Sequence, residues 1–134
     1  MATILKPENL KNVKDYEPPL NVHRGINSKT VEKTMLTMSH VYIPPAGRNQ
    51  RHYHVKCDAY HYILKGRLRC FIGPDHEMEE FVVEPGDFVF VPQGVIHGLM
   101  NLSNTETAEI LGGYCGVGHA DEAETVKVEP LWDK

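Results

Sequence analysis

The sequence has no apolar run that approaches the roughly 18–20 residues of a membrane-spanning helix. Its amino terminus, MATILKPENL, lacks the apolar core of a signal peptide. The formal net charge is −4, and no cluster of lysine and arginine resembles a phosphate-binding patch. We therefore expect neither a membrane nor a nucleic acid among the partners of this chain.

Cysteine is also scarce. The chain has three, Cys57, Cys70 and Cys115, which are widely spaced and form no C-x-x-C pair. An odd number with this spacing favours reduced thiols over a disulfide framework. The expected location is the cytoplasm.

No segment repeats apolar residues with a period of 3.6 over the length of a central helix. The chain instead has short runs of β-forming residues, separated by glycine, proline and polar turns: 34–43, 59–64, 67–73, 79–84, 88–91, 97–102 and 108–117. Strands this short, spaced by about 8–12 residues, indicate an all-β sandwich or barrel. At 134 residues, the chain fits a single domain.

The positions of proline, glycine and polar turn residues divide the chain into three parts. Residues 1–33 are polar and broken by prolines and glycine, so we expect an amino-terminal arm that could supply one edge strand. Residues 34–118 contain the barrel strands. Residues 119–134 form a tail that packs on the barrel as a short helical turn or a docking strand.

The chain contains eight histidines, and three of them lie in the stretch RHYHVKCDAYHYILKG, residues 51–66. Side chains at positions i and i+2 of a strand point to the same face, about 6–7 Å apart. His52 and His54 can therefore converge on one ion. Such a pair is also common as a surface feature, so this spacing alone leaves both interpretations open.

A second cluster lies in GDFVFVPQGVIHGLMN, residues 86–101. Its spacing is G-x5-P-x-G-x2-H-x3-N, formed by Gly86, Pro92, Gly94, His97 and Asn101. This pattern resembles the second motif of the cupin superfamily. The first cupin motif, G-x5-H-x-H-x3,4-E-x6-G, is matched by Gly47, His52, His54 and Gly66, with one residue fewer between Gly47 and His52.

The resemblance implies a double-stranded β-helix, the jelly-roll barrel of the cupins. It also places the two motifs on opposing strands that line the barrel, so that His97 joins His52 and His54 around one metal ion. Three imidazoles suit Fe2+, Ni2+, Zn2+, Cu2+ or Co2+, whereas Mn2+ usually prefers more oxygen ligands. We expect Fe2+, because three-histidine centres among cupins are associated with ring-cleaving, diketone and thiol dioxygenases.

The acidic ligand of the first motif is missing. Counting back from Gly66, its position is held by Ala59. Asp58 lies one residue away and is a candidate fourth ligand only if the preceding loop bulges, because a shift of one residue reverses the face of a strand. His61 shares the parity of Ala59. It can be a fourth ligand, a proton-transferring base or an ordinary interior histidine.

Two arginines on the next strand, Arg67 and Arg69, share one face by alternation. If this face looks inward, a guanidinium can bind a carboxylate or enolate substrate. The simpler interpretation is that both decorate the outer surface.

These observations lead to one function and two alternatives. The first is a metal-dependent single-domain cupin acting on a small organic molecule, as an iron(II) dioxygenase. The alternatives are a redox-neutral isomerase, epimerase or lyase with His61 as the base, and a non-catalytic cupin that binds a small molecule. Small cupins commonly pair through sheet edges, so we expect a homodimer.

Overall fold

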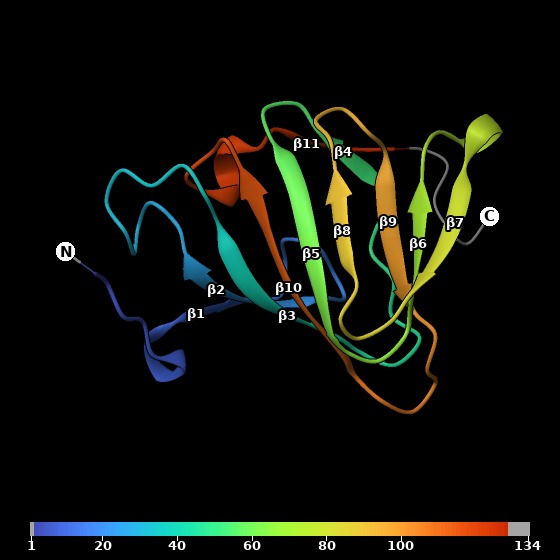
Figure 1. The fold of residues 1–134 in the computed structure, drawn as a ribbon, viewed down its shortest axis with the longest axis horizontal. Helices are drawn as coiled ribbons and strands as arrows, with labels where there is room; N and C mark the ends of the chain where they lie inside the picture. Colours follow the sequence, from blue (N-terminus) through green and yellow to red (C-terminus); the bar gives the residue numbers. More distant parts are fainter. Residues whose placement is uncertain (1, 129–134) are drawn as a thin grey trace.

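The computed structural model describes residues 2–128, which form two antiparallel β-sheets that curl against each other (Figure 1). The first sheet has the order β1 (Lys11–Val13), β2 (Asn21–Ile26), β3 (Met38–Ile43), β10 (Ala108–Cys115), β5 (Asp58–Lys65) and β8 (Phe88–Val91). The second has the order β11 (Thr125–Lys127), β4 (His52–His54), β9 (His97–Asn101), β6 (Leu68–Ile72) and β7 (Glu79–Val83). The predicted all-β jelly roll is confirmed.

The helices of the described residues are three short 3-10 turns, Pro7–Asn9, Asp75–Glu77 and Ala120–Glu122. None of them has the length or the apolar character needed to cross a membrane.

Each of the seven predicted β runs contains a strand, and the turns between them lie where glycine was expected to place them. Gly86 precedes β8 and Gly94 precedes β9, with φ of 99° and 83°. Glycine adopts this left-handed region without the steric penalty that a side chain would cause. The two motif glycines therefore end one strand and set the start of the next.

Apolar side chains from both sheets fill the space between them. Alternation is clearest in β10, where every second residue from Ala108 to Tyr114 is buried. The most deeply buried apolar side chains are Ile43, Ile63, Leu68 and Ile110. Because a strand period of two sends alternate residues to one face, this pattern fixes which side chains face the interior.

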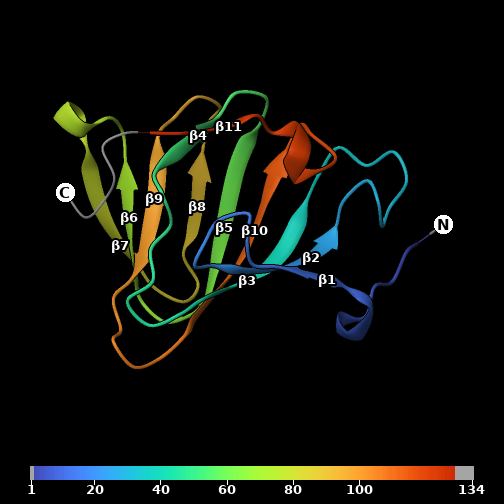
Figure 2. The ribbon, with the colours of Figure 1, turned by 180° about the vertical axis from the view of Figure 1, so that it is seen from behind.

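The amino-terminal arm is a larger part of the sheet than the single edge strand expected. It forms both β1 and β2; β2 pairs with β3, and Leu20 and Val22 lie in the core. The loop between β1 and β2, blue in Figure 2, connects these two strands and carries Glu17. The arm therefore closes one side of the barrel interior.

The tail also packs on the barrel, as far as the structure describes it. Its 3-10 turn is followed by β11, which pairs antiparallel with β4 along Tyr53 and both flanking histidines. The remainder of the predicted tail, residues 129–134, lies outside the described residues.

Asn101, the last residue of the second motif, joins three segments. It is 2% exposed, and its amide donates to the carbonyls of Ile43, Pro44 and Glu106 while its Oδ1 accepts from the Ser103 amide. Replacing it with alanine would leave these buried groups unpaired.

We expect Asn101→Ala to lower the free energy of unfolding by about 2–4 kcal/mol. Urea denaturation would measure the change, with the exposed Asn104→Ala as the control, for which we expect about 0.5 kcal/mol or less. A loss below about 1 kcal/mol in Asn101→Ala would show that water replaces these hydrogen bonds.

Candidate metal centre

The three predicted histidines meet inside the barrel. His52 and His54 lie on β4, and His97 begins β9, where it pairs directly with His52. One ring nitrogen from each lies within 4.8 Å of the others, and all three side chains are buried. The two strands are antiparallel neighbours in one sheet, and their three histidines line the interior of the barrel. The group can hold one metal ion.

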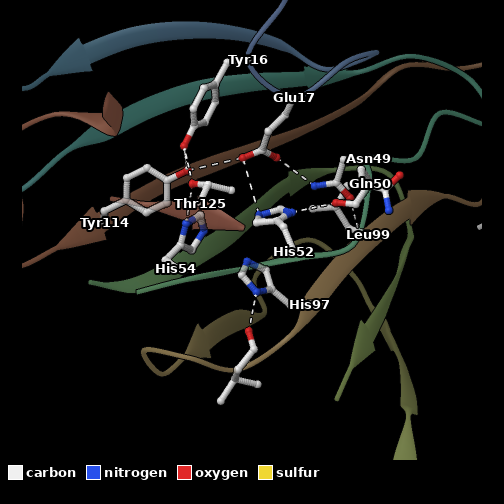
Figure 3. A network of polar contacts seen from close by, with 11 residues as sticks. Tyr16, Glu17, Asn49, Gln50, His52, His54, His97, Leu99, Tyr114 and Thr125 are labelled. Atoms are coloured by element: carbon white, nitrogen blue, oxygen red, sulfur yellow. Dashed lines mark hydrogen bonds and ion pairs between the residues drawn. The ribbon is translucent and has the colours of Figure 1, made fainter. Parts of the chain in front are cut away.

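Hydrogen bonds fix the tautomers of two of these rings. Nδ1 of His52 lies 2.7 Å from the Gln50 carbonyl, and Nδ1 of His97 lies 2.9 Å from the Val95 carbonyl (Figure 3). A carbonyl oxygen only accepts, so each Nδ1 carries the proton. In the neutral form of each ring, Nε2 then keeps its lone pair for a metal, as in most histidine ligands.

A chain of hydroxyl groups fixes the tautomer of the third ring. The Tyr114 hydroxyl donates to Glu17 at 3.4 Å and lies 3.0 Å from the Tyr16 hydroxyl. The Tyr16 hydroxyl lies 3.0 Å from Thr125 Oγ1. Thr125 Oγ1 in turn lies 2.9 Å from His54 Nδ1. Each hydroxyl has one proton to donate. Because the carboxylate at the far end accepts, Tyr16 donates to Tyr114, Thr125 to Tyr16, and Nδ1 of His54 to Thr125. We call this chain of hydrogen bonds the hydroxyl relay.

The remaining nitrogen of His54 is an unpaired buried atom. Its Nε2 has no hydrogen-bond partner among residues 2–128. An unsatisfied buried polar atom costs about 1–3 kcal/mol, so such atoms are uncommon without a function. A metal ion at the centre of the three rings would give this nitrogen its partner, and the residues present therefore fit a metal.

Burial keeps two of these rings neutral. Burial, followed by the neighbouring His52, lowers the pKa of His54 to about 4 and that of His97 to about 2. Neutral imidazole is the form that binds metals. Near neutral pH, the centre needs no proton release from these two ligands.

A glutamate that the sequence did not reveal lies beside the histidines. Oε1 of Glu17 is 3.9 Å from His52 Nε2, and Oε2 accepts from Asn49 Nδ2 at 2.8 Å. Burial alone would raise the pKa of Glu17, but its electrostatic interaction with His52 and the Asn49 hydrogen bond outweigh it, and the pKa is lowered. The carboxylate is therefore ionised at neutral pH. Only the closure of the β1–β2 loop brings it here, so no local motif signals it.

The histidines form one wall of a cavity with a volume of about 70 Å³. Its walls include Ala59 and His61 of β5, and Arg24 of β2 is the single arginine or lysine among the described lining residues. At about 10–15 Å³ per water, this volume suits a molecule of a few heavy atoms.

The parity argument for β5 is confirmed in part. Ala59 is buried and His61 lines the cavity, so both face inward as predicted. Asp58 has the opposite parity, and its carboxylate accepts from the Gln93 amide at 2.9 Å. The structure does not bring Asp58 to the three histidines, because the loop before β5 does not bulge enough to reverse its face.

The two candidate substrate-binding arginines lie on the outer surface. Arg67 pairs with Glu84 at 3.0 Å and Arg69 with Glu80 at 3.6 Å, all four side chains being 40–62% exposed. Neither lines the cavity. The inward positions of this strand belong to Leu68 and Cys70, so alternation sends the arginines outward.

Comparisons with known proteins agree with this architecture. The sequence profile of a family described as Cupin matches residues 3–114. Germin-like protein subfamily 3 member 2 of Arabidopsis thaliana is 31% identical over 72 residues, which cover 53% of this chain and 31% of that protein. The chain thus spans less than a third of the curated relative that it matches.

Solved structures with the same fold include oxalate-converting enzymes. Oxalate decarboxylase of Lactobacillus farciminis, in a formate complex, has a TM-score of 0.74 at 19% identity, covering 90% of this chain and 34% of that chain. An oxalate oxidase bound to the substrate analogue glycolate has a TM-score of 0.72 at 17% identity, with 93% and 63% covered. At these identities the likeness shows the fold alone.

We expect the protein to bind one equivalent of Co2+ or Zn2+, and His54→Ala to weaken binding by about 100-fold or more, because one of three histidine ligands is lost. Isothermal titration calorimetry would measure this. The matched control is His76→Ala, since this side chain is 77% exposed and far from the centre in sequence. Equal affinities in both variants would contradict the assignment.

Breaking the hydroxyl relay should weaken the site without removing a ligand. Tyr16→Phe deletes the hydroxyl that joins Thr125 to Tyr114, and we expect about a 10-fold loss in metal affinity. Tyr62→Phe is the control, because this tyrosine packs on Phe88 outside the site. Unchanged affinity in Tyr16→Phe would show that the relay does not set the His54 tautomer.

Proposed function

The chain belongs to the cupin family, and we propose that it is a non-haem iron(II) dioxygenase acting on a small organic anion. The observation that carries this proposal is the convergence of three buried imidazoles on one wall of a cavity, each with its Nδ1 held by a hydrogen bond. When bound there, a divalent iron supplies Lewis acidity and redox chemistry toward dioxygen. The protein residues would hold the ion, orient the substrate and restrict the access of water to the cavity.

Arg24 supports an anionic substrate. Its guanidinium lines the cavity, lies over the Tyr16 ring at 5.4 Å and is 3.4 Å from His119 Nε2. No carboxylate among residues 2–128 lies within ion-pair distance of it. An arginine placed this way can bind a substrate carboxylate.

The small cavity volume and the fold agree with this substrate class. A similar structure, an oxalate oxidase, was solved with glycolate, a small carboxylic acid, as its substrate analogue. We therefore propose small carboxylates as the first substrates to test, ahead of diketones, thiols and dihydroxybenzoates.

A redox-neutral reaction is the second candidate, and His61 favours it. Its ring faces the cavity and makes no hydrogen bond to another described residue. Burial lowers its pKa to about 4. A neutral imidazole in this position can accept a proton from a substrate carbon or hydroxyl, as an isomerase, epimerase or lyase requires.

Oxygen uptake separates these candidates. With iron(II)-loaded protein, we expect at least one small carboxylate to cause dioxygen consumption in an oxygen-electrode assay, and Arg24→Gln to raise KM by about 10-fold or more, because the charge-assisted contact is lost. Arg67→Gln, on the outer surface, is the matched control and should leave KM unchanged.

Product formation without oxygen uptake, abolished in His61→Asn with metal content retained, would support the redox-neutral reaction instead. A substrate-sized molecule that binds and is never converted would indicate a non-catalytic binding protein.

Homodimer formation stays a prediction. Besides the amino-terminal arm, the edge strands β7 and β8 offer a face for it, where Phe81, Phe88 and Phe90 are 48%, 82% and 61% exposed. Large exposed apolar side chains are typical of protein interfaces. The cytoplasmic location also stays a prediction, and the three free cysteines support it.

A further inference from the structure

We propose that Glu17, carried by the amino-terminal arm, is the fourth protein ligand of the metal. It would take the role that the family motif gives to an acid at the position of Ala59. This inference rests on the proposed metal site and adds a ligand from outside both motifs. Four features of the structure support it.

The first feature is the distance between two atoms, each of which has a lone pair facing the other. Glu17 Oε1 and His52 Nε2 face each other at 3.9 Å, which is too long for a hydrogen bond. When His52 is neutral, its proton is on Nδ1, so neither facing atom has one to share. Two electron-rich atoms in this arrangement repel each other unless a cation lies between them or a second proton is taken up.

The second is that the spacing fits a shared metal. Metal–nitrogen and metal–oxygen bonds are about 2.1 Å long. Two donor atoms on one ion are therefore about 3.0 Å apart when their bonds form a right angle, and about 4.2 Å apart when they lie on opposite sides of the ion. The distance of 3.9 Å falls in this range. Oε1 can therefore share an ion with His52, but it has to move toward the other rings, because Glu17 is not part of the group whose donor atoms all lie within 4.8 Å of one another.

The third is the orientation of the carboxylate. Asn49, which is 3% exposed, donates to Oε2 at 2.8 Å, while its Oδ1 accepts from the Leu99 amide at 2.9 Å. The Tyr114 hydroxyl donates to Oε1 at 3.4 Å. The carboxylate is thus anchored to β9 and β10, with Oε1 toward His52, as Figure 3 shows. Metal-binding carboxylates are commonly held by such outer hydrogen bonds.

The fourth is the space left at the motif position. Ala59 pairs with Tyr114 across β5 and β10, and the Tyr114 ring packs on His54 with centroids 4.6 Å apart. A glutamate at position 59 would have to share this space with the tyrosine. With alanine at position 59 and Tyr114 beside it, a carboxylate can approach the centre from the side on which Glu17 lies.

A carboxylate ligand changes the expected chemistry. An ion with three neutral imidazoles and one carboxylate carries one positive charge less than with the histidines alone. An octahedral ion would keep about two positions for substrate and dioxygen, and an added oxygen ligand makes Mn2+ more acceptable. The arm would then be part of the metal site as well as of the sheet.

Cobalt titration tests this proposal, because the visible spectrum of Co2+ reports its ligands. The variants are Glu17→Gln, which keeps the shape and one of the two accepting oxygens, and Glu17→Asp, which keeps the charge on a shorter side chain. Glu8→Gln, an exposed glutamate of the same arm, is the control. Calorimetry gives the affinity, and circular dichroism confirms folding.

We expect Glu17→Gln to weaken Co2+ binding by about 100-fold or more and to change the visible spectrum of the bound ion, with Glu17→Asp intermediate and Glu8→Gln unchanged. A Glu17→Gln spectrum identical to the wild type would overturn the proposal, even with weaker binding, because Glu17 would then act only through hydrogen bonds.

Failure of the metal site itself would look different: the wild-type protein would bind no Co2+, and both proposals would be wrong. If Glu17→Gln did not fold, a crystal structure of the wild-type Co2+ complex would decide. A Glu17 oxygen at about 2.0–2.2 Å from the ion supports the proposal, and one beyond about 3 Å overturns it.

Discussion

The antiparallel register between β4 and β9 sets His52 opposite His97, and the candidate metal centre depends on this pairing. The two residues lie in separate motifs, and their strands meet only because the jelly roll places them side by side. The strand period then adds His54, two residues along on the same face. A shift of one residue in either strand would turn ligands out of the cavity, so the hydrophobic alternation that fixes the register also fixes the site.

Around this pairing, polar groups are arranged so that the nitrogen of each ring facing the centre is unprotonated. Two backbone carbonyls hold the protons of His52 and His97 on Nδ1, and the hydroxyl relay does the same for His54. Buried polar networks are stabilising only when their members are satisfied. Here the unsatisfied atom is His54 Nε2, at the place where a ligand would bind. A metal ion bound by the three rings would give this atom its partner.

Local rules predicted much of this. The i, i+2 spacing of His52 and His54, the fixed spacing around His97 and the parity of Ala59 and His61 all follow from short stretches of sequence, and the structure agrees with each. The strands were predictable for the same reason, since their apolar residues and their glycine and proline turns are local signals. Arg67 and Arg69 show the limit of parity, because alternation groups side chains on a face without saying which face is inward.

Glu17, Asn49 and Tyr114 were not predictable from the motifs. Each reaches the centre through long-range closure: a loop of the arm, the segment before β4 and the second half of β10. A single glutamate before two prolines carries no pattern that points to a histidine 35 residues later. The sequence motifs predicted no acid beside the three histidines, and the tertiary structure places Glu17 there.

The central claim is that one metal ion is held by His52, His54 and His97 with an acid from the arm. X-ray absorption at the metal edge of the protein as isolated tests it most directly. We expect a first shell of nitrogen and oxygen at about 2.1 Å, with the outer scattering of about three imidazole rings. A metal without imidazole scattering, or protein that neither contains nor takes up a divalent ion, would contradict the account.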